Sequence, residues 1–159
     1  MISVLSIVTA DATIGFLLWD KAPAKVYMGD AVALFLGVLL SVLTIRLNPG
    51  LAPNWKSLAL SLILFAVPNF DTYIAVFSII KRGASPFQSG KDHLSHRLGR
   101  KSLQRKTAAI VLWALGAIFG LLAISIYSWS DQLGSQLIIG TATLWLLLFI
   151  WFWKIPSED

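Results

Sequence analysis

Residues 107–128 read TAAIVLWALGAIFGLLAISIYS, an unbroken run without a charged side chain. A run of about 20 apolar residues is long enough to cross the hydrocarbon core of a bilayer as an α-helix. Four further segments have the same character: Ile2–Trp19, Ala31–Ile45, Ser57–Ile80 and Gln136–Trp153. These segments are continuous and lack the two-residue alternation of barrel strands. The sequence therefore predicts an all-α, polytopic membrane helix bundle of about five transmembrane helices.

The composition of the 159-residue chain agrees with this fold class. Hydrophobic residues make up 57% of the chain and charged residues 13%, against about 25% charged residues in an ordinary globular domain. The mean hydropathy is +0.74. Cysteine is absent, which excludes a disulfide framework, a thiolate nucleophile and any cysteine-ligated metal site.

The basic residues are concentrated on alternate connections. Two lysines follow the first apolar segment, eight basic residues lie in residues 81–106 and one lysine follows the fifth segment, so eleven of the thirteen fall on one side. The positive-inside rule then predicts that 81–106 is a cytoplasmic basic loop, with the N-terminus outside and the C-terminus cytoplasmic. The net charge of +5 is explained by this placement, so we expect no nucleic-acid partner.

The first candidate site is the stretch PAKVYMGD at 23–30, in which Asp30 stands where the second apolar segment begins. A carboxylate at a helix N-terminus is favoured by the helix dipole, so Asp30 caps the helix in one interpretation. In the other it is a ligand of Mg2+, which proteins usually hold by one or two carboxylates together with substrate phosphate oxygens. The residues alone leave both interpretations open.

The second candidate is Asp71, in the stretch PNFDT at 68–72 inside the third apolar segment. A charge at this depth costs at least roughly 2.5 kcal/mol, so the side chain should face protein or water. Asp71 either pairs with a basic residue of a neighbouring helix or belongs to a functional site. Pro68 removes a helical hydrogen bond and predicts a kink.

The third candidate is the stretch GKDHLSHRL at 90–98, within the basic loop. His93 and His96 share one face if this stretch is helical, and Lys91 and Arg97 lie beside them. Such a group of donors suits a polyanion such as a diphosphate. The alternative is a solvated basic loop attracted to anionic lipid headgroups.

Motifs in these stretches, in this order, resemble the polyprenyl-phosphate N-acetylhexosamine-1-phosphate transferases, or glycosyl transferase family four. This membrane family includes phospho-N-acetylmuramoyl-pentapeptide transferase. The resemblance covers nearly the whole chain, from the first motif through the fourth apolar segment. The motifs that carry it are GFLLWD at 15–20, PA at 23–24, MGD at 28–30, PNFDT at 68–72 and HLSHRL at 93–98.

The resemblance implies a reaction at the cytoplasmic face of the cell membrane. N-acetylhexosamine 1-phosphate would pass from a UDP-N-acetylhexosamine to a polyprenyl (undecaprenyl) phosphate, releasing UMP, in the synthesis of cell-envelope polysaccharide or peptidoglycan precursors. It also implies Mg2+ as the cofactor, with Asp30 as the catalytic and metal-binding residue. The residues expected to bind the substrates are Asp71, Lys91, His93, His96 and Arg97.

The sequence departs from the family pattern in three places. Ala31–Ala33 replace the small Ser-Gly pair that usually follows Met-Gly-Asp, and Ser95 replaces the middle histidine of the loop. The paired aspartates of the family lie in the half that would precede Met1. We therefore expect residues 1–159 to form a single membrane domain that resembles the C-terminal half of the enzyme. We also expect that this domain needs an N-terminal half to complete the reaction.

A rival hypothesis places the chain in a different functional class. In this hypothesis it is a small, non-catalytic membrane protein whose basic loop binds anionic lipid or a partner protein. Gly116 and Gly120, spaced as Gly-x-x-x-Gly in the fourth apolar segment, would let another helix approach closely for assembly. This rival predicts that function is indifferent to Asp30.

Overall fold

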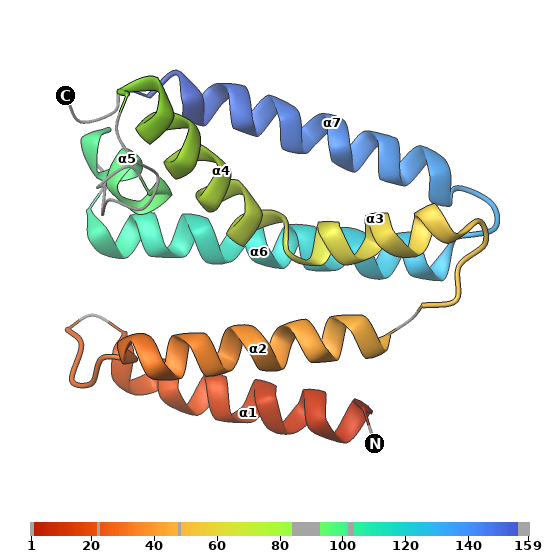
Figure 1. Cartoon of the computed structure of the whole chain (residues 1–159), viewed down its shortest axis with the longest axis horizontal. Helices are drawn as coiled ribbons and strands as arrows, with labels where there is room; N and C mark the ends of the chain where they lie inside the picture. Colours follow the sequence, from red (N-terminus) through yellow and green to blue (C-terminus); the bar gives the residue numbers. More distant parts are fainter. Residues whose placement is uncertain (1, 22, 48, 84–92, 102–103, 156–159) are drawn as a thin grey trace. The chain divides into compact units, whose positions relative to one another are not determined.

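The described part of the chain is entirely helical, with seven helices and no strand (Figure 1). The chain divides into two compact units, residues 1–50 and 51–159. The computed structural model describes residues 2–21, 23–47, 49–83, 93–101 and 104–155. The predicted all-α fold class is confirmed. The predicted orientation of the termini and the single membrane domain stay predictions.

The first unit consists of α1 (Ile2–Asp20) and α2 (Gly29–Leu47), which pack against each other. Both are long and apolar enough to cross a membrane, and among their described side chains only Thr9 is buried. Two threonines of α1 are satisfied within the helix, because the hydroxyl groups of Thr9 and Thr13 donate to the carbonyl groups four residues earlier, both at 2.7 Å. Such bonds let a hydroxyl lie inside a span at little cost.

The second unit contains five helices. Two of them are long, apolar candidate spans, and two shorter ones together form a bent candidate span. With α1 and α2, the described residues therefore hold four straight spans, or five if the bent pair is counted, as the sequence predicts. The helices are α3 (Asn54–Leu64), α4 (Ala66–Lys81), α5 (Leu94–Arg100), α6 (Arg105–Ser128) and α7 (Gly134–Trp153).

The predicted third span is broken into α3 and α4, whose axes differ in direction by 73°. The break lies at Phe65, three residues before Pro68. Proline has no N–H with which to continue the hydrogen bonding of α3, and it is tolerated in the first turn of α4. The predicted kink is confirmed. The indole N–H of Trp145 donates to the carbonyl oxygen of Ala66 at 3.2 Å, so α7 is bonded to the bend.

Two apolar clusters form the core of the second unit. The first joins α3, the start of α4, α6 and α7 and contains Leu51, Leu60, Ile63, Ala66, Phe119, Ala123, Ile126 and Ile138. The second joins α4, α5, α6 and α7 and contains Phe70, Ile74, Leu94, Leu98, Ala108, Phe152 and Ile155. Phe70 meets the rings of Trp145, Phe149 and Phe152 edge-on at centroid distances of 5.3 to 5.7 Å, an arrangement that aromatic pairs favour. Phe70 thus fixes α4 against α7 next to Asp71.

The Gly116 and Gly120 pair does not bring helices together within the second unit. A methyl group built on either glycine meets no other heavy atom within 4 Å among the described residues of this unit. The close approach of another helix that the Gly-x-x-x-Gly spacing predicts stays a prediction.

Candidate functional site

The short helix α5 brings the two histidines of the basic loop to one end of the second unit. It lies beside α4 and the start of α6, at the end where α7 finishes (Figure 1). Leu94, Arg97 and Leu98 are at most 2% exposed, and their spacing of three and four residues places them on one helix face. His93 and His96 are exposed. The histidines are thus presented outward by a helix whose other face is buried.

Asp71, on α4, is the residue that holds the beginning of α5. Its Oδ2 lies 2.7 Å from Nδ1 of His93, and its Oδ1 accepts a hydrogen bond from the backbone N–H of Leu94 at 2.6 Å. The first N–H groups of a helix lack partners within the helix, and a carboxylate there is also favoured by the helix dipole. Asp71 therefore pairs with a neighbouring helix, as one interpretation predicts, and its predicted contact with a substrate stays a prediction.

The Asp71 contact orients the imidazole of His93. An ionised carboxylate only accepts hydrogen bonds, so the Nδ1 atom of His93 carries the hydrogen and Nε2 is the ring nitrogen left for other partners. About half of the His93 side chain is exposed. In the neutral imidazole Nε2 accepts a proton or a hydrogen bond, and in the charged form it donates one. The pair therefore presents an oriented acid or base, with His96 one turn along α5.

Arg97 is buried, and its guanidinium ties α5 to two other helices. Nη1 donates to the carbonyl oxygens of Phe152 at 3.1 Å and Ile155 at 2.6 Å, while Nη2 donates to Oγ of Ser78 on α4. The last carbonyl groups of a helix lack donors within the helix, and the dipole favours a cation at this end. The ring of Trp153 lies 5.8 Å from the guanidinium carbon. The guanidinium of Arg97 thus donates its hydrogen bonds to α4 and to the end of α7. Its predicted contact with a substrate stays a prediction.

Asp30 lies in the first unit, in the first turn of α2, and its side chain is exposed. It follows Gly29, whose φ of +68° is in the left-handed region that favours glycine. No group of three or more metal-ligating side chains occurs among the described residues. One accessible carboxylate still fits Mg2+ that takes its remaining ligands from phosphate oxygens and water. Asp30 is therefore the residue that would hold this ion, and its predicted roles stay predictions.

Lys91, the remaining predicted substrate-binding residue, lies outside the described residues. Of the predicted set, the structure brings Asp71 and His93 into direct contact. It places His96 and Arg97 on the same short helix, facing opposite environments.

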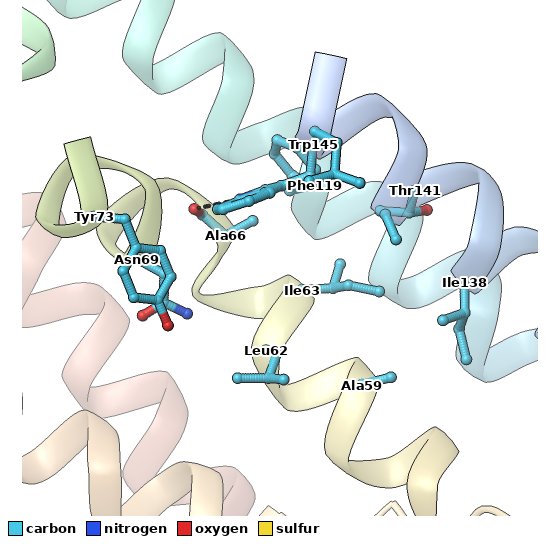
Figure 2. Close-up of a pocket in the computed structure, with 12 residues that line it drawn as sticks. Ala59, Leu62, Ile63, Ala66, Asn69, Tyr73, Phe119, Ile138, Thr141 and Trp145 are labelled. Atoms are coloured by element: carbon cyan, nitrogen blue, oxygen red, sulfur yellow. Dashed lines mark hydrogen bonds between the residues drawn. The ribbon is translucent and has the colours of Figure 1, made fainter. Parts of the chain in front are cut away.

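An apolar pocket that the sequence did not predict lies at the bend between α3 and α4 (Figure 2). Its volume is about 370 Å³, and Figure 2 shows side chains of α3 and α7 on opposite sides of it. Most of the lining is apolar, with Asn69, Tyr73 and Thr141 as polar members. The sequence signal was a helix-breaking Pro68 close to small residues. A pocket of this size and lining suits a hydrocarbon chain.

Comparisons with known proteins agree with the motifs. Residues 1–48 match the sequence model of the family described as Glycosyl transferase family 4. A probable undecaprenyl-phosphate N-acetylglucosaminyl 1-phosphate transferase of Bacillus subtilis is 33% identical over 148 residues, which are 93% of this chain and 37% of the relative. The chain is thus similar to members of this family, in agreement with the resemblance predicted from the sequence.

Two further relatives align with most of the chain. The decaprenyl-phosphate N-acetylglucosaminephosphotransferase of Mycobacterium tuberculosis is 30% identical over 92% of this chain and 40% of its own length. The phospho-N-acetylmuramoyl-pentapeptide-transferase of Corynebacterium kroppenstedtii is 29% identical over 84% of this chain and 34% of its own length. No solved structure matches the chain. This chain spans between a third and two fifths of the length of these curated relatives, and it is a multi-pass membrane protein.

Proposed function

We propose that this chain carries part of a transferase that moves N-acetylhexosamine 1-phosphate from a UDP-N-acetylhexosamine to polyprenyl phosphate, at the cytoplasmic face of the cell membrane. The observation that carries the proposal is the alignment of 93% of the chain with a relative named as an undecaprenyl-phosphate N-acetylglucosaminyl 1-phosphate transferase. The product would enter the synthesis of cell-envelope polysaccharide or peptidoglycan precursors.

The proposed reaction forms one phosphorus–oxygen bond and breaks one. An oxygen of the polyprenyl phosphate attacks the β-phosphorus of the UDP-sugar. The bond from that phosphorus to the bridging oxygen breaks, and UMP leaves with the electron pair. Phosphoryl transfer of this kind depends mainly on positioning and on neutralising charge. A metal ion held by a carboxylate would neutralise charge, and cationic donors would do the same.

Each predicted residue has a place in this proposal. Asp30 would hold Mg2+, which neutralises charge on the diphosphate when bound. His93, oriented by Asp71, would direct its Nε2 toward a phosphate oxygen, and His96 and Lys91 would add further donors. Arg97 would act through position, because its bonds to the end of α7 fix the helix that presents both histidines.

The pocket at the bend is the proposed binding site for part of the polyprenyl chain. Its apolar lining belongs to α3, α4, α6 and α7, and the names of the Bacillus subtilis and Mycobacterium tuberculosis relatives both specify a polyprenyl phosphate. Because an isoprenoid chain has no polar groups, an apolar pocket in the membrane-spanning part of the protein suits it better than water-filled space.

The test is UMP release from UDP-N-acetylglucosamine and undecaprenyl phosphate. The purified chain is assayed alone and after co-expression with the part of the Bacillus subtilis relative that it does not cover. We expect turnover only in the co-expressed assembly. Asp30→Asn should abolish this turnover, while the control Asp131→Asn, which changes an exposed carboxylate between α6 and α7, should retain it.

Binding provides a readout that does not require turnover. If the assembly is inactive, Mg2+-dependent binding of UDP-N-acetylglucosamine is measured instead, and Asp30→Asn should remove it. Binding or turnover that is indifferent to Asp30→Asn would overturn the proposal. A graded loss of lipid or partner binding with added salt and with removal of loop charges would instead support the non-catalytic rival.

A further inference from the structure

A second pocket lies between α4 and α7, near the ends of both helices, and plays no part in the proposed reaction. Its volume is about 480 Å³, within the range of ligand-binding pockets. The lining combines an apolar body with two lysines. The lining residues are Phe77, Ile80, Lys81, Phe149, Ile150, Trp153 and Lys154.

The two lysines make the pocket cationic at the helix ends. Lys81 is the last residue of α4, and Lys154 follows the last residue of α7. Both are exposed, and neither forms an ion pair with an acidic side chain of the described residues. The ammonium of Lys81 lies 5.8 Å from the centroid of the Trp153 ring. Two like charges in one pocket repel each other, so an anion between them is favoured.

The apolar lining determines what kind of anion fits. Phe77, Ile80 and Ile150 are each about half exposed, and they belong to helices of the membrane-spanning unit. Tryptophan is enriched where a span meets the headgroup region, and lysines at helix ends extend toward the same region. A free phosphate would leave the apolar part of the pocket unfilled, whereas a lipid fills it with hydrocarbon.

We propose that this pocket binds one anionic phospholipid of the bilayer. One acyl chain lies along the apolar side chains of α4 and α7, and the phosphate is placed between Lys81 and Lys154. Trp153 lines this pocket and also lies against the guanidinium of Arg97. The bound lipid therefore adjoins the contact that fixes α5 to the end of α7.

The experiment is a lipid titration of the purified chain in detergent, followed by native mass spectrometry. The probes are phosphatidylglycerol and phosphatidylcholine with identical acyl chains. We expect one phosphatidylglycerol to be retained with at least tenfold preference over phosphatidylcholine. The double variant Lys81→Gln, Lys154→Gln should bind phosphatidylglycerol about 30-fold more weakly, the equivalent of about 1 kcal/mol for each lysine near an anionic headgroup.

A matched control removes the same charge elsewhere. Lys25 and Lys101 are also exposed and also stand over tryptophan rings, at 5.5 Å from Trp19 and 5.1 Å from Trp151, and neither lines this pocket. The double variant Lys25→Gln, Lys101→Gln should retain phosphatidylglycerol within about twofold of the unchanged chain, because the charge it loses lies outside the pocket.

Three results would overturn the proposal. Equal losses in the two double variants would mean general attraction of charge and no site. Equal retention of the two phospholipids would mean that the lysines do not select the headgroup. The third is that undecaprenyl phosphate displaces phosphatidylglycerol one for one, and that the Lys81→Gln, Lys154→Gln variant loses this displacement. The pocket would then be a binding site for the acceptor lipid. None of these readouts depends on sugar transfer, so they are separate from the test of the proposed reaction.

Discussion

Replacing Arg97 by methionine should release α5 from the end of α7. Methionine keeps much of the side-chain volume but donates none of the hydrogen bonds to Phe152, Ile155 and Ser78. Arg97 is 2% exposed, so water does not replace these bonds without opening the contact. Hydrogen bonds from a charged donor contribute about 1.5–3 kcal/mol each, and the burial of the charge offsets part of that. We expect the docking of α5 to weaken by about 3 kcal/mol.

Hydrogen exchange measures this loss directly. The amide groups of residues 94–100 exchange when α5 opens, so a loss of about 3 kcal/mol corresponds to exchange roughly 100-fold faster. Amides of α1, in the other unit, should keep their rates. Arg97→Lys should fall between the two, because an ammonium keeps the charge but cannot reproduce the planar arrangement of guanidinium donors.

The control for charge alone is Lys101→Met, which removes an exposed cation at the end of the same helix. The ammonium of Lys101 stands over the Trp151 ring, and an exposed contact of this kind contributes about 0.5–1 kcal/mol. Exchange of α5 should therefore rise no more than about fivefold. The reasoning fails if Arg97→Met leaves exchange in α5 unchanged, or if Lys101→Met accelerates it equally.

Three further predictions concern the carboxylate, the bend and its pocket. Asp71→Ala should accelerate exchange of the α5 amides about tenfold, because a lost helix cap costs about 1 kcal/mol or more. Asp71→Asn keeps an oxygen for the Leu94 N–H and should accelerate this exchange less. Equal acceleration in the two variants would contradict the capping role. Trp145→Phe removes the donor to Ala66 and should lower Tm in detergent by about 2–4 °C, on the basis of about 1 kcal/mol, and an unchanged Tm would show that this bond contributes nothing. Ala142→Trp should fill part of the bend pocket and raise KM for undecaprenyl phosphate at least tenfold in the co-expressed assembly, with KM for the UDP-sugar unchanged. A rise in both KM values would contradict a polyprenyl-binding site in this pocket.

The straight spans were predictable because a bilayer imposes a simple rule. A segment that crosses the hydrocarbon core must be apolar, about 20 residues long and hydrogen-bonded within itself. The predicted Gln136–Trp153 and the observed α7 at Gly134–Trp153 differ only at the start. Pro68 likewise indicated a break in the third span, since the chemistry of proline is local. The angle of 73° was not predictable, because it depends on how α3 and α4 pack on α6 and α7.

The contacts of the candidate site were less accessible to sequence reasoning. Asp71 and His93 were both selected from the sequence, yet nothing in the 21 residues between them indicates that the loop returns to α4. Arg97 was expected among the donors to the substrate because it lies in a basic loop. Its burial depends on carbonyl groups at Phe152 and Ile155, more than fifty residues later. Such pairings arise from tertiary packing, which local patterns do not contain.

The bend between α3 and α4 divides one membrane crossing between two short helices. A helix advances 1.5 Å per residue, so α3 and α4 measure about 17 Å and about 24 Å, and an angle of 73° sets the two ends of the bent pair about 33 Å apart. The hydrocarbon core of a bilayer is about 30 Å thick, so neither helix is long enough to cross it alone, whereas the bent pair is. We therefore expect the backbone groups at the bend to lie at membrane depth, where water is scarce and where Trp145 donates to the carbonyl oxygen of Ala66.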